Sequence, residues 1–297
     1  EYSLHIDLPA PIQAIYDAFV NNNKKLYLVG GAVRDALLGK KPKDFDLATD
    51  ALPTEVQTIL TKSGIRNYPI GESFGVISAI LDGHEFEIAT FRGEDYTGGD
   101  GRRPTSVSFS DMATDVSRRD LTINALYYDI QAGKVIDLVG GVEDIKNKRI
   151  KAVGSPMARF EEDKLRTLRA LRFAHRFGSS LDQETIDAII HFRHLPGVSA
   201  ERIRDEFIKS LHSSMKPEEF LNQFSSLGLM PRIFPALALH FNFITGIRNF
   251  CFVIAKLLGQ NPLNKIVKVM REATMSDSEM GTVQFLIKLK DRFQEFN

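Results

Sequence analysis

Two aspartates one residue apart, Asp44 and Asp46, are the first side chains in the sequence that could do chemistry together. If the segment DFDLAT (44–49) is a β-strand, both carboxylates point to one face, about 7 Å apart along the chain. Carboxylates at this spacing can reach two divalent cations about 3.5–4 Å apart, as two-metal phosphoryl transfer requires. An isolated pair of this kind is more often two exposed acids on an edge strand, so its interpretation depends on the surrounding residues.

A glycine pair lies thirteen residues before Asp44 and supplies a second element of such a site. Gly30 and Gly31 follow the apolar strand predicted for LYLV (26–29), and without side chains their amides can approach a phosphate. Arg34 follows in the first turn of the next predicted helix. Backbone donors, a cation and two metal ligands are what phosphoryl transfer needs. The spacing GGAVRD lacks the GxGxxG pattern of a dinucleotide fold.

A third carboxylate is expected on a neighbouring strand, because the attacking hydroxyl must be deprotonated or held near the metal. The segment HEFEIATFR (84–92) alternates as a strand and places Glu85 and Glu87 on one face, with Phe86 and Ile88 toward the core. We favour Glu87 as the third acid and keep Glu85 as the alternative. The alternative without a catalytic role is that both glutamates are ordinary solvent-facing residues of a strand.

The segment RRDLTINALYY (118–128) combines two arginines with an acid. Arg118 and Arg119 could contact triphosphate oxygens, and Asp120 could accept a hydrogen bond from a sugar hydroxyl. Asp120 could equally be the N-cap of a helix entered at Leu121, which is the usual role of an Asp before an apolar helical run. Both interpretations stay open on this segment alone.

The segment EEDKLRTLRALR (161–172) repeats charged residues at every third position. Asp163, Arg166, Arg169 and Arg172 therefore form one drifting stripe along a predicted helix. An Asp accepting from an exocyclic amino group, beside a donating Arg, would match the paired edge of cytosine or adenine and reject uracil and guanine. A salt-bridged helix face is the commoner meaning of such a pattern and is favoured for this segment in isolation.

The elements that must position these residues alternate between strands and helices up to about residue 150 and are helical afterwards. Gly39 is expected to end the short helix after Gly31 in the left-handed conformation. The further predicted elements are helices at 9–22 and 52–64, a hairpin at 75–91 turning at Asp82-Gly83, a mobile glycine-rich loop at 93–107, a helix and strand pair around Gly133, and a helix at 157–178.

Composition is that of a soluble globular chain: 43% of the 297 residues are hydrophobic and 26% are charged. No apolar run approaches the ~20 residues of a membrane span, and no secretory leader pattern is visible, so a cytoplasmic protein is expected. The single cysteine, Cys251, excludes an internal disulfide. The zero net charge combines an acidic first half, with 17 basic and 22 acidic side chains up to residue 150, and a mildly basic remainder that could hold a polyanion.

Taken together, the motifs resemble the class II nucleotidyltransferases, the family of bacterial tRNA CCA-adding enzymes and poly(A) polymerases. Any one motif is weak, but six in the family's order are specific. The resemblance is strong over residues 26–178 and looser over EEFLNQFSSLGLMPRIFPAL (218–237). The six segments are LVGGAVRDALLG, DFDLAT, EIATFR, DGRRPTSVSF, RRDLTINALYY and EEDKLRTLRALRFA.

The resemblance implies a role for each candidate residue. Gly31 and Arg34 match positions that bind the incoming triphosphate, and Arg119 and Asp120 match the pair that contacts triphosphate and ribose. Asp44 and Asp46 match magnesium ligands. In the helical segment, Asp163 and Arg166 match the residues that select the bases C and A. Arg169 and Arg172 match further nucleotide-binding arginines.

The implied reaction is template-independent transfer of a nucleotide from CTP or ATP to a tRNA 3′ end, with Mg²⁺ as cofactor and pyrophosphate release. Poly(A) polymerases usually carry a basic Gly-Arg-Arg/Lys-Phe signature where this chain reads IGESFGVISAI, and their basic tails are absent, which favours tRNA over poly(A) work. The loop from Arg92 to Phe109 looks compatible with adding the terminal A. Poly(A) synthesis, CC-only addition and A-only addition stay as alternatives, and a non-catalytic RNA-binding protein ranks below them.

The fold implied is α+β: a polymerase β-like nucleotidyltransferase head with a mixed sheet, followed by all-α regions. We expect a head at residues 1–150, a helical neck at 151–215 with the nucleotide-selecting motif, and an RNA-binding helical body at 216–297. Many family members are longer, which leaves open whether the tail that grips the tRNA elbow is complete. No membrane association and no obligate protein partner are inferred.

Overall fold

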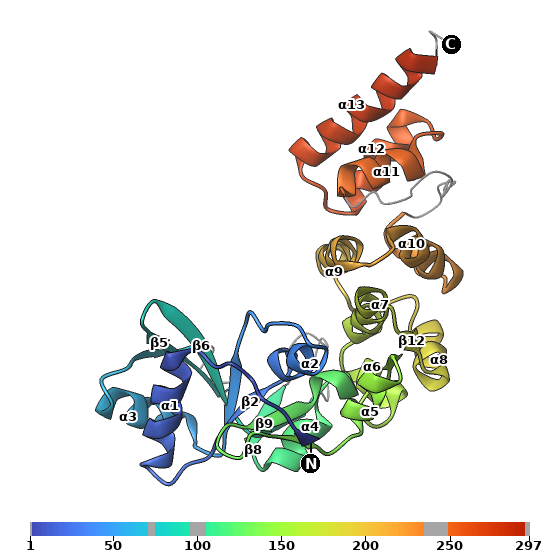
Figure 1. Cartoon of the computed structure of the whole chain (residues 1–297). Helices are drawn as coiled ribbons and strands as arrows, with labels where there is room; N and C mark the ends of the chain where they lie inside the picture. The colour runs from blue at the N-terminus through green and yellow to red at the C-terminus, as the bar shows by residue number, and fades with distance from the viewer. Residues whose placement is uncertain (1, 71–74, 96–104, 235–248, 295–297) are drawn as a thin grey trace. The chain divides into compact units, whose positions relative to one another are not determined.

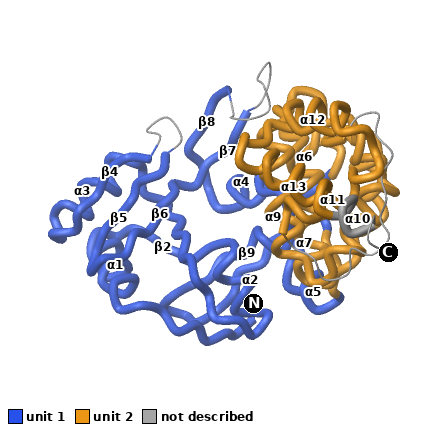
Figure 2. Tube along the Cα trace, turned by 90° about the horizontal axis from the view of Figure 1, so that it is seen from above, with its two compact units in different colours: residues 1–147, 151–155 blue, residues 148–150, 156–297 orange. Residues whose placement is uncertain are grey.

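The computed structural model describes residues 2–70, 75–95, 105–234 and 249–294. They divide into two compact units, residues 1–147 with 151–155 and residues 148–150 with 156–297, shown in blue and orange in Figure 2. Residues 148–150 belong to the second unit because β11 (Arg149–Ile150) pairs with β12 (Ser180–Leu181) of that unit. The predicted division into head, neck and body at residues 150 and 215 stays a prediction.

The first unit is built on an eight-stranded mixed sheet in the order β1-β10-β9-β2-β3-β6-β5-β4 (Figure 1). Only β3 and β6 run parallel within it, and all other neighbouring strands are antiparallel. This mixed sheet confirms the α+β class predicted for the head. The strands are β1 (Tyr2–Ser3), β2 (Leu26–Val29), β3 (Asp46–Thr49), β4 (Arg66–Pro69), β5 (Val76–Leu81), β6 (His84–Thr90), β9 (Leu126–Asp129) and β10 (Lys134–Asp137).

One face of this sheet, here called the apolar face, carries Leu28, Leu47, Ile88 and the residues two positions away from them along each strand, such as Leu26 and Phe86. Leu28 and Ile88 are fully buried, because helices cover this face. Burying each such side chain contributes about 1.5–3 kcal/mol, so this layer holds the sheet together. The helices that contribute to the core are α1 (Ala10–Val20), α2 (Gly31–Leu37), α3 (Pro53–Lys62) and α5 (Gly141–Lys146).

The opposite face, here called the acidic face, carries Asp46, Glu85 and Glu87 beside a small apolar cluster that includes Ala48 and Tyr127. The cluster is completed by residues of α4 (Met112–Ser117). Separate from the main sheet, β7 (Arg92–Asp95) and β8 (Ser106–Phe109) form a two-stranded ribbon, so the ends of the predicted loop are strands. The rest of that loop, 96–104, lies outside the described residues.

Several local predictions are confirmed. Helix α1, strand β2 and helix α2 form where they were expected, and Gly39 follows α2 with a φ of 67°. The β5–β6 hairpin turns at Asp82 and Gly83, whose φ angles are 50° and 76°. Positive φ at both central residues is what a tight hairpin turn needs, and Asp followed by Gly tolerates it.

The predicted strand at 44–49 is two residues too long at its start. Strand β2 ends at Val29, because Gly30 adopts φ 73° and ψ −124° and turns the chain into α2. The last pairing of β3 with β2 is therefore Asp46 opposite Val29, and Asp44 lies before the strand. The prediction that Asp44 and Asp46 share one strand face was wrong for this reason.

The helix predicted to begin at Leu121 is also absent: only a 3-10 turn spans Thr122–Asn124. Leu121 bridges to Ala152 and the amide of Thr122 donates to the carbonyl of Lys151, so tertiary pairing takes the backbone out of a helical path. A β-carbon on Gly141 would lie 2.2 Å from the Thr122 carbonyl oxygen, so only glycine allows this close approach.

The second unit is helical apart from the β11–β12 pair. Five phenylalanines form its centre, with Phe207 in ring contact with the other four at centroid distances of 5.1–6.4 Å. Among the described residues, no helix of the chain is long and apolar enough to span a membrane. The helices are α6 (Pro156–Glu162), α7 (Leu165–Phe177), α8 (Gln183–His191), α9 (Ala200–Ser213), α10 (Pro217–Ser226), α11 (Phe250–Leu258), α12 (Leu263–Glu272) and α13 (Asp277–Gln294).

The single helix predicted at 157–178 is two helices, because the chain breaks at Asp163 and Lys164. Asp163 Oδ1 accepts from the amide of Leu165 at 3.1 Å, and the Asp163 carbonyl accepts from the amide of Arg166 at 3.0 Å. An aspartate that binds the backbone two residues on starts a new turn. Asp163 therefore precedes α7 and is not on one continuous stripe with the arginines.

Candidate active site

Asp46 and Glu87 lie on adjacent parallel strands, at positions next to the paired residues Leu47 and Ile88. Their side chains share the acidic face, because Leu47 and Ile88 both belong to the apolar one. The chain separates the two acids by some forty residues, and the parallel β3–β6 pairing brings them side by side. The structure thus places the predicted third acid next to one of the two predicted metal ligands.

Lost hydration is the main influence on the pKa values of this pair. Loss of hydration raises the pKa of Asp46 although it keeps contact with solvent, nearby Arg119 lowers it, and Asp44 raises it further. Loss of hydration likewise raises the pKa of Glu87, and the charges of Asp46 and Glu85 add to the effect. A cation bound here would relieve that repulsion, and carboxylate oxygens suit Mg²⁺.

Glu85 has a different environment, although it lies on the same face. Its carboxylate accepts hydrogen bonds from the hydroxyls of Ser78, at 2.6 Å, and Tyr68. These two hydrogen bonds lower the pKa of Glu85. Glu85 is thus engaged by its own sheet neighbours, which supports Glu87 as the acid nearer to the chemistry.

Asp44 is exposed and acts on Asp46 only through its charge. Within the described ranges, no three side chains of His, Cys, Asp or Glu converge closely enough to hold a metal ion. Asp44, Asp46 and Glu87 therefore do not form a preformed triad, and their metal-binding roles stay predictions.

The glycine turn lies beside two arginines. Arg34 is 5% exposed, and its guanidinium donates to Asp35 at 2.7–2.8 Å and to Asn124 Oδ1 at 2.6 Å. A β-carbon on Gly30 would lie 3.6 Å from the Asn124 carbonyl oxygen and 3.8 Å from Arg119 Nη1. The predicted Gly30, Gly31, Arg34 and Arg119 are thus brought together around one turn.

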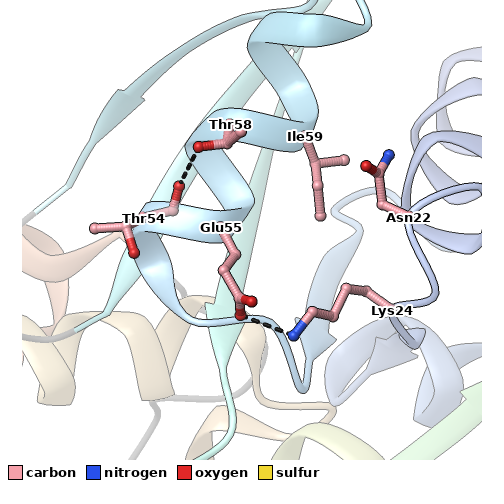
Figure 3. Close-up of a pocket in the computed structure, with 6 residues that line it drawn as sticks. All are labelled: Asn22, Lys24, Thr54, Glu55, Thr58 and Ile59. Carbon is pink, nitrogen blue, oxygen red and sulfur yellow. Dashed lines mark hydrogen bonds and ion pairs between the residues drawn. The ribbon is translucent and has the colours of Figure 1, made fainter.

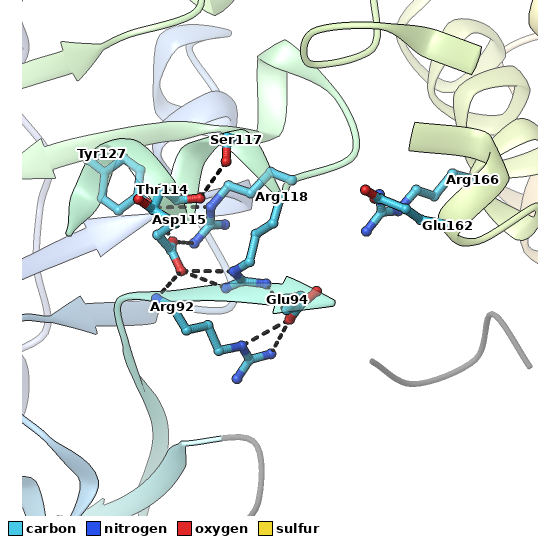
Figure 4. Close-up of polar contacts among 10 residues, drawn as sticks. Arg92, Glu94, Thr114, Asp115, Ser117, Arg118, Tyr127, Glu162 and Arg166 are labelled. Carbon is cyan, nitrogen blue, oxygen red and sulfur yellow. Dashed lines mark hydrogen bonds and ion pairs between the residues drawn. The ribbon is translucent and has the colours of Figure 1, made fainter. Parts of the chain in front are cut away.

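Arg119 is held by two neighbours that the sequence did not single out. Its Nη2 donates to Asp115 Oδ2 at 2.9 Å, and its Nε donates to the Tyr127 hydroxyl at 3.1 Å. Asp115 also binds Arg118, which in turn pairs with Glu94 (Figure 4). The side chain of Asp115 is 1% exposed, so this carboxylate is a buried anchor for two adjacent arginines.

Asp120, which was predicted to act together with Arg119, forms hydrogen bonds with nearby residues of its own segment. Its Oδ1 accepts from the amide of Leu121 at 2.7 Å and from Asn124 Nδ2 at 3.2 Å. Neither contact is an α-helix N-cap, because no α-helix follows. Asn124 consequently connects Asp120 to Arg34, which links the two ends of the candidate site through one side chain.

In the second unit, the predicted base-selecting residues bind different partners. Arg166 Nη1 donates to Glu162 at 2.7 Å, as Figure 4 shows, and Asp163 accepts from Arg202 at 3.3 Å. Arg172 pairs with Glu206, which is 4% exposed. The guanidinium of Arg169 lies 5.7 Å from the Phe173 ring.

Sequence reasoning missed Asp115, Tyr127 and Asn124. A signal for Asp115 was present, because it lies three and four residues before Arg118 and Arg119, the spacing at which helical neighbours meet. No local signal identifies Tyr127, which reaches Asp115 and Arg119 only because β9 pairs with β2.

A separate surface hollow of about 260 Å³ lies between α3 and the segment that follows α1 (Figure 3). It contains a Lys24–Glu55 ion pair of 2.8 Å. Both helices belong to the apolar face, so this hollow is away from the predicted site residues. Its lining residues are Asn22, Lys24, Thr54, Glu55, Thr58 and Ile59.

Comparison with known proteins places this geometry in a family. Residues 26–151 match the poly A polymerase head domain, and residues 178–240 match the probable RNA and SrmB-binding site of polymerase A. A CCA-adding enzyme of Lactobacillus helveticus is 37% identical over 282 residues, which are 89% of this chain and 67% of that protein. A CCA-adding enzyme of Bacillus pumilus is 45% identical over 188 residues, 62% of this chain.

The match to the Bacillus pumilus protein spans about half of its length, 45%. Among solved structures, that of the Bacillus stearothermophilus CCA-adding enzyme in complex with CTP matches with a TM-score of 0.74 and 27% identity. It covers 96% of this chain and 71% of that one. The chain therefore belongs to the class II nucleotidyltransferase family of CCA-adding enzymes and poly(A) polymerases.

Proposed function

We propose that the protein adds C and A from CTP and ATP to the 3′ end of tRNA, without a nucleic-acid template. The observation that carries the proposal is the acidic face itself, where Asp46 and Glu87 adjoin and Arg119 acts on Asp46. Similarity to CCA-adding enzymes over 89% of the chain supports the choice of tRNA as substrate. The enzyme would work where tRNA matures, in the cytoplasm.

Residues of the first unit would bind the triphosphate and the ribose of the incoming nucleotide. Arg34 and Arg119 lie beside the turn at Gly30 and Gly31, where guanidinium and amide donors would bind the triphosphate oxygens and stabilise charge developing toward pyrophosphate. Asp120 would orient the ribose by accepting from its hydroxyl. Positioning and charge stabilisation supply most of the rate in phosphoryl transfer.

Asp44 and Asp46 would hold Mg²⁺, and Glu87 would assist as the third acid. The raised pKa values of Asp46 and Glu87, caused first by lost hydration, fit such a role, because a bound divalent cation favours the ionised form of both carboxylates. The bound metal would lower the cost of deprotonating the RNA 3′-hydroxyl. The protein's own share is to keep both carboxylates on one rigid sheet face.

Base selection is assigned to the second unit. Asp163 would accept from the exocyclic amino group of C or A, and Arg166 would donate to the adjacent ring nitrogen. Arg166 now pairs with Glu162 and Asp163 with Arg202, and a bound base would have to replace or share these contacts. Arg169 and Arg172 are assigned to further nucleotide contacts.

The deciding experiment supplies purified protein and Mg²⁺ with three tRNAs, ending before CCA, at C and at CC, one nucleotide at a time. Product lengths read by gel should show C added to the first two and A to the third. Addition of neither nucleotide would contradict the proposal. CC-only or A-only products would identify a partial enzyme.

Poly(A) synthesis is the second candidate, because the matched head domain is that of poly A polymerase. Long A-tails on an unstructured RNA, with no use of CTP, would establish it. A chain that binds tRNA and transfers nothing would instead be the non-catalytic alternative.

Replacing Arg166 tests base selection. Arg166→Ala should reduce the preference for CTP and ATP over UTP and GTP by about 10- to 100-fold, the scale of one lost base-edge pair worth about 1–3 kcal/mol. Single-turnover incorporation of all four nucleotides measures it. The control is Lys164→Ala, which removes the contacts of Lys164 Nζ with Glu161 and with the Phe192 ring. Full discrimination in Arg166→Ala would contradict the template role.

A further inference from the structure

We infer that Asp115 and Tyr127 are positioning residues that aim Arg119 at the glycine turn. This inference rests on the proposed function, since it specifies how the triphosphate end of the same site is built. Asp115 is buried at 1% exposure and Tyr127 is fully buried.

The guanidinium of Arg119 is fixed at two of its three nitrogens. Nε donates to the Tyr127 hydroxyl and Nη2 donates to Asp115 Oδ2, and the Tyr127 hydroxyl itself donates to Asp115 Oδ2. The guanidinium carbon lies 5.2 Å from the Tyr127 ring centroid, so the ring supports one side of the group. These contacts form a closed triangle of three side chains.

The third nitrogen, Nη1, is the one that faces the glycine turn, 3.8 Å from where a β-carbon on Gly30 would be. The triangle therefore fixes the direction in which Arg119 presents its remaining N–H groups. An arginine already held in one orientation loses less side-chain freedom when an anion binds. Gly30 keeps that approach open, because its position has no side chain and a φ of 73°.

The anchor carboxylate does not bind Arg119 alone. Asp115 Oδ2 accepts from Arg119, and Asp115 Oδ1 accepts from Arg118 at 2.8–2.9 Å. Arg118 and Arg92 in turn pair with Glu94. Burial raises the pKa of Asp115, but Arg119, Arg118 and the Tyr127 hydroxyl outweigh burial and hold that pKa below its ordinary value.

The consequence is specific to the triphosphate. If the triangle only stabilised the fold, its disruption would weaken all nucleotides alike. If it aims Arg119, disruption should weaken CTP, whose triphosphate reaches the glycine turn, and leave CMP nearly unchanged. The ratio of the two affinities is therefore the informative quantity.

The test measures Kd for CTP and for CMP by calorimetry on the full chain with Mg²⁺. Tyr127→Phe keeps the ring and removes one hydroxyl, and Asp115→Asn keeps the shape and removes the charge. For each variant, Kd for CTP should rise about 10- to 100-fold, the scale of hydrogen bonds to charged groups, while Kd for CMP changes less than about twofold. Glu94→Gln, which touches Arg118 and Arg92 but not Arg119, is the matched control and should leave the ratio unchanged.

A double-mutant cycle with Arg119→Ala completes the test. Once Arg119 is absent, Tyr127→Phe should no longer change the CTP affinity, because its effect acts through Arg119. Additive losses, or equal losses for CTP and CMP, would overturn the inference while leaving the proposed function intact. Failure of the unaltered protein to bind CTP would contradict the proposed function itself.

Discussion

The two faces of the head sheet are made by the same strands and differ in almost every physical respect. On the apolar face, Leu28, Leu47 and Ile88 are buried under helices. On the acidic face, Asp46 and Glu87 lie side by side, each with a pKa raised by lost hydration and by neighbouring acids. Burial on the apolar face stabilises the fold. On the acidic face, the loss of hydration of ionised carboxylates opposes it.

The two faces also differ in the charges that they carry. The carboxylates of the acidic face lose hydration, and burial on the apolar face stabilises the sheet on which they lie. The buried carboxylate of Asp115, by contrast, is paired with Arg118 and Arg119. The exposed Asp46 and Glu87 carry raised pKa values, and the role proposed for them is in catalysis.

Asp46→Ala should give the largest effect on transfer. We expect nucleotide transfer to fall on the order of 10³-fold or more, because a metal site contributes several kcal/mol to the transition state. Single-turnover transfer to tRNA measures this effect. Binding of tRNA should be largely retained, and the melting temperature should not fall, because the raised pKa shows that ionised Asp46 is disfavoured in the fold. Unchanged turnover would remove the metal role of Asp46.

Glu87→Gln and Glu85→Gln form a matched pair on one strand. Glu87→Gln should reduce transfer by about 100-fold, the scale of a lost charge-stabilising group, whereas Glu85→Gln should change it less than about threefold. The reason is position: Glu87 adjoins Asp46, and Glu85 is engaged by Ser78 and Tyr68. Initial rates at saturating CTP compare them, and a larger loss in Glu85→Gln would reverse the assignment.

Asp115→Asn tests whether the ionised carboxylate of Asp115 stabilises the fold in a pH-dependent way. Because the pKa of Asp115 is lower in the fold than its ordinary value of 3.8, its ionised form stabilises the fold above that value. This stabilisation is lost as pH falls through the lowered pKa. At pH 7 the variant should lose about 3 kcal/mol, as for a broken buried pair. Urea unfolding at pH 7 and below pH 4 should show the difference narrowing with acid, and a constant difference would contradict it.

Lys24→Met should have the smallest effect. The Lys24–Glu55 pair lies at the hollow on the apolar side of the unit, with side chains 27% and 41% exposed. Exposed pairs of this kind contribute about 0.2–1 kcal/mol. Thermal unfolding should shift only slightly and transfer should be unchanged. A marked loss of transfer would show that the chemistry is not confined to the acidic face.

Local pattern was enough to predict the elements whose periodicity is undisturbed. Alternation in HEFEIATFR placed Glu87 and Ile88 on opposite faces, and the Asp82-Gly83 pair marked the hairpin turn. Pattern failed where a distant segment intervened. The helix expected at Leu121 is replaced by a bridge to Ala152, and the β3 strand is shortened because Gly30 ends its partner.

The sequence by itself determined which residue types could do the chemistry, and six ordered motifs were sufficient to identify the family. It also determined, through period-two alternation, that Asp46, Glu85 and Glu87 face away from the apolar layer. Only the tertiary structure decided that Glu87 adjoins Asp46 and that Asp115 and Tyr127 hold Arg119. The physical reason is that strand pairing and register bring together residues far apart in the chain, and no local periodicity specifies them.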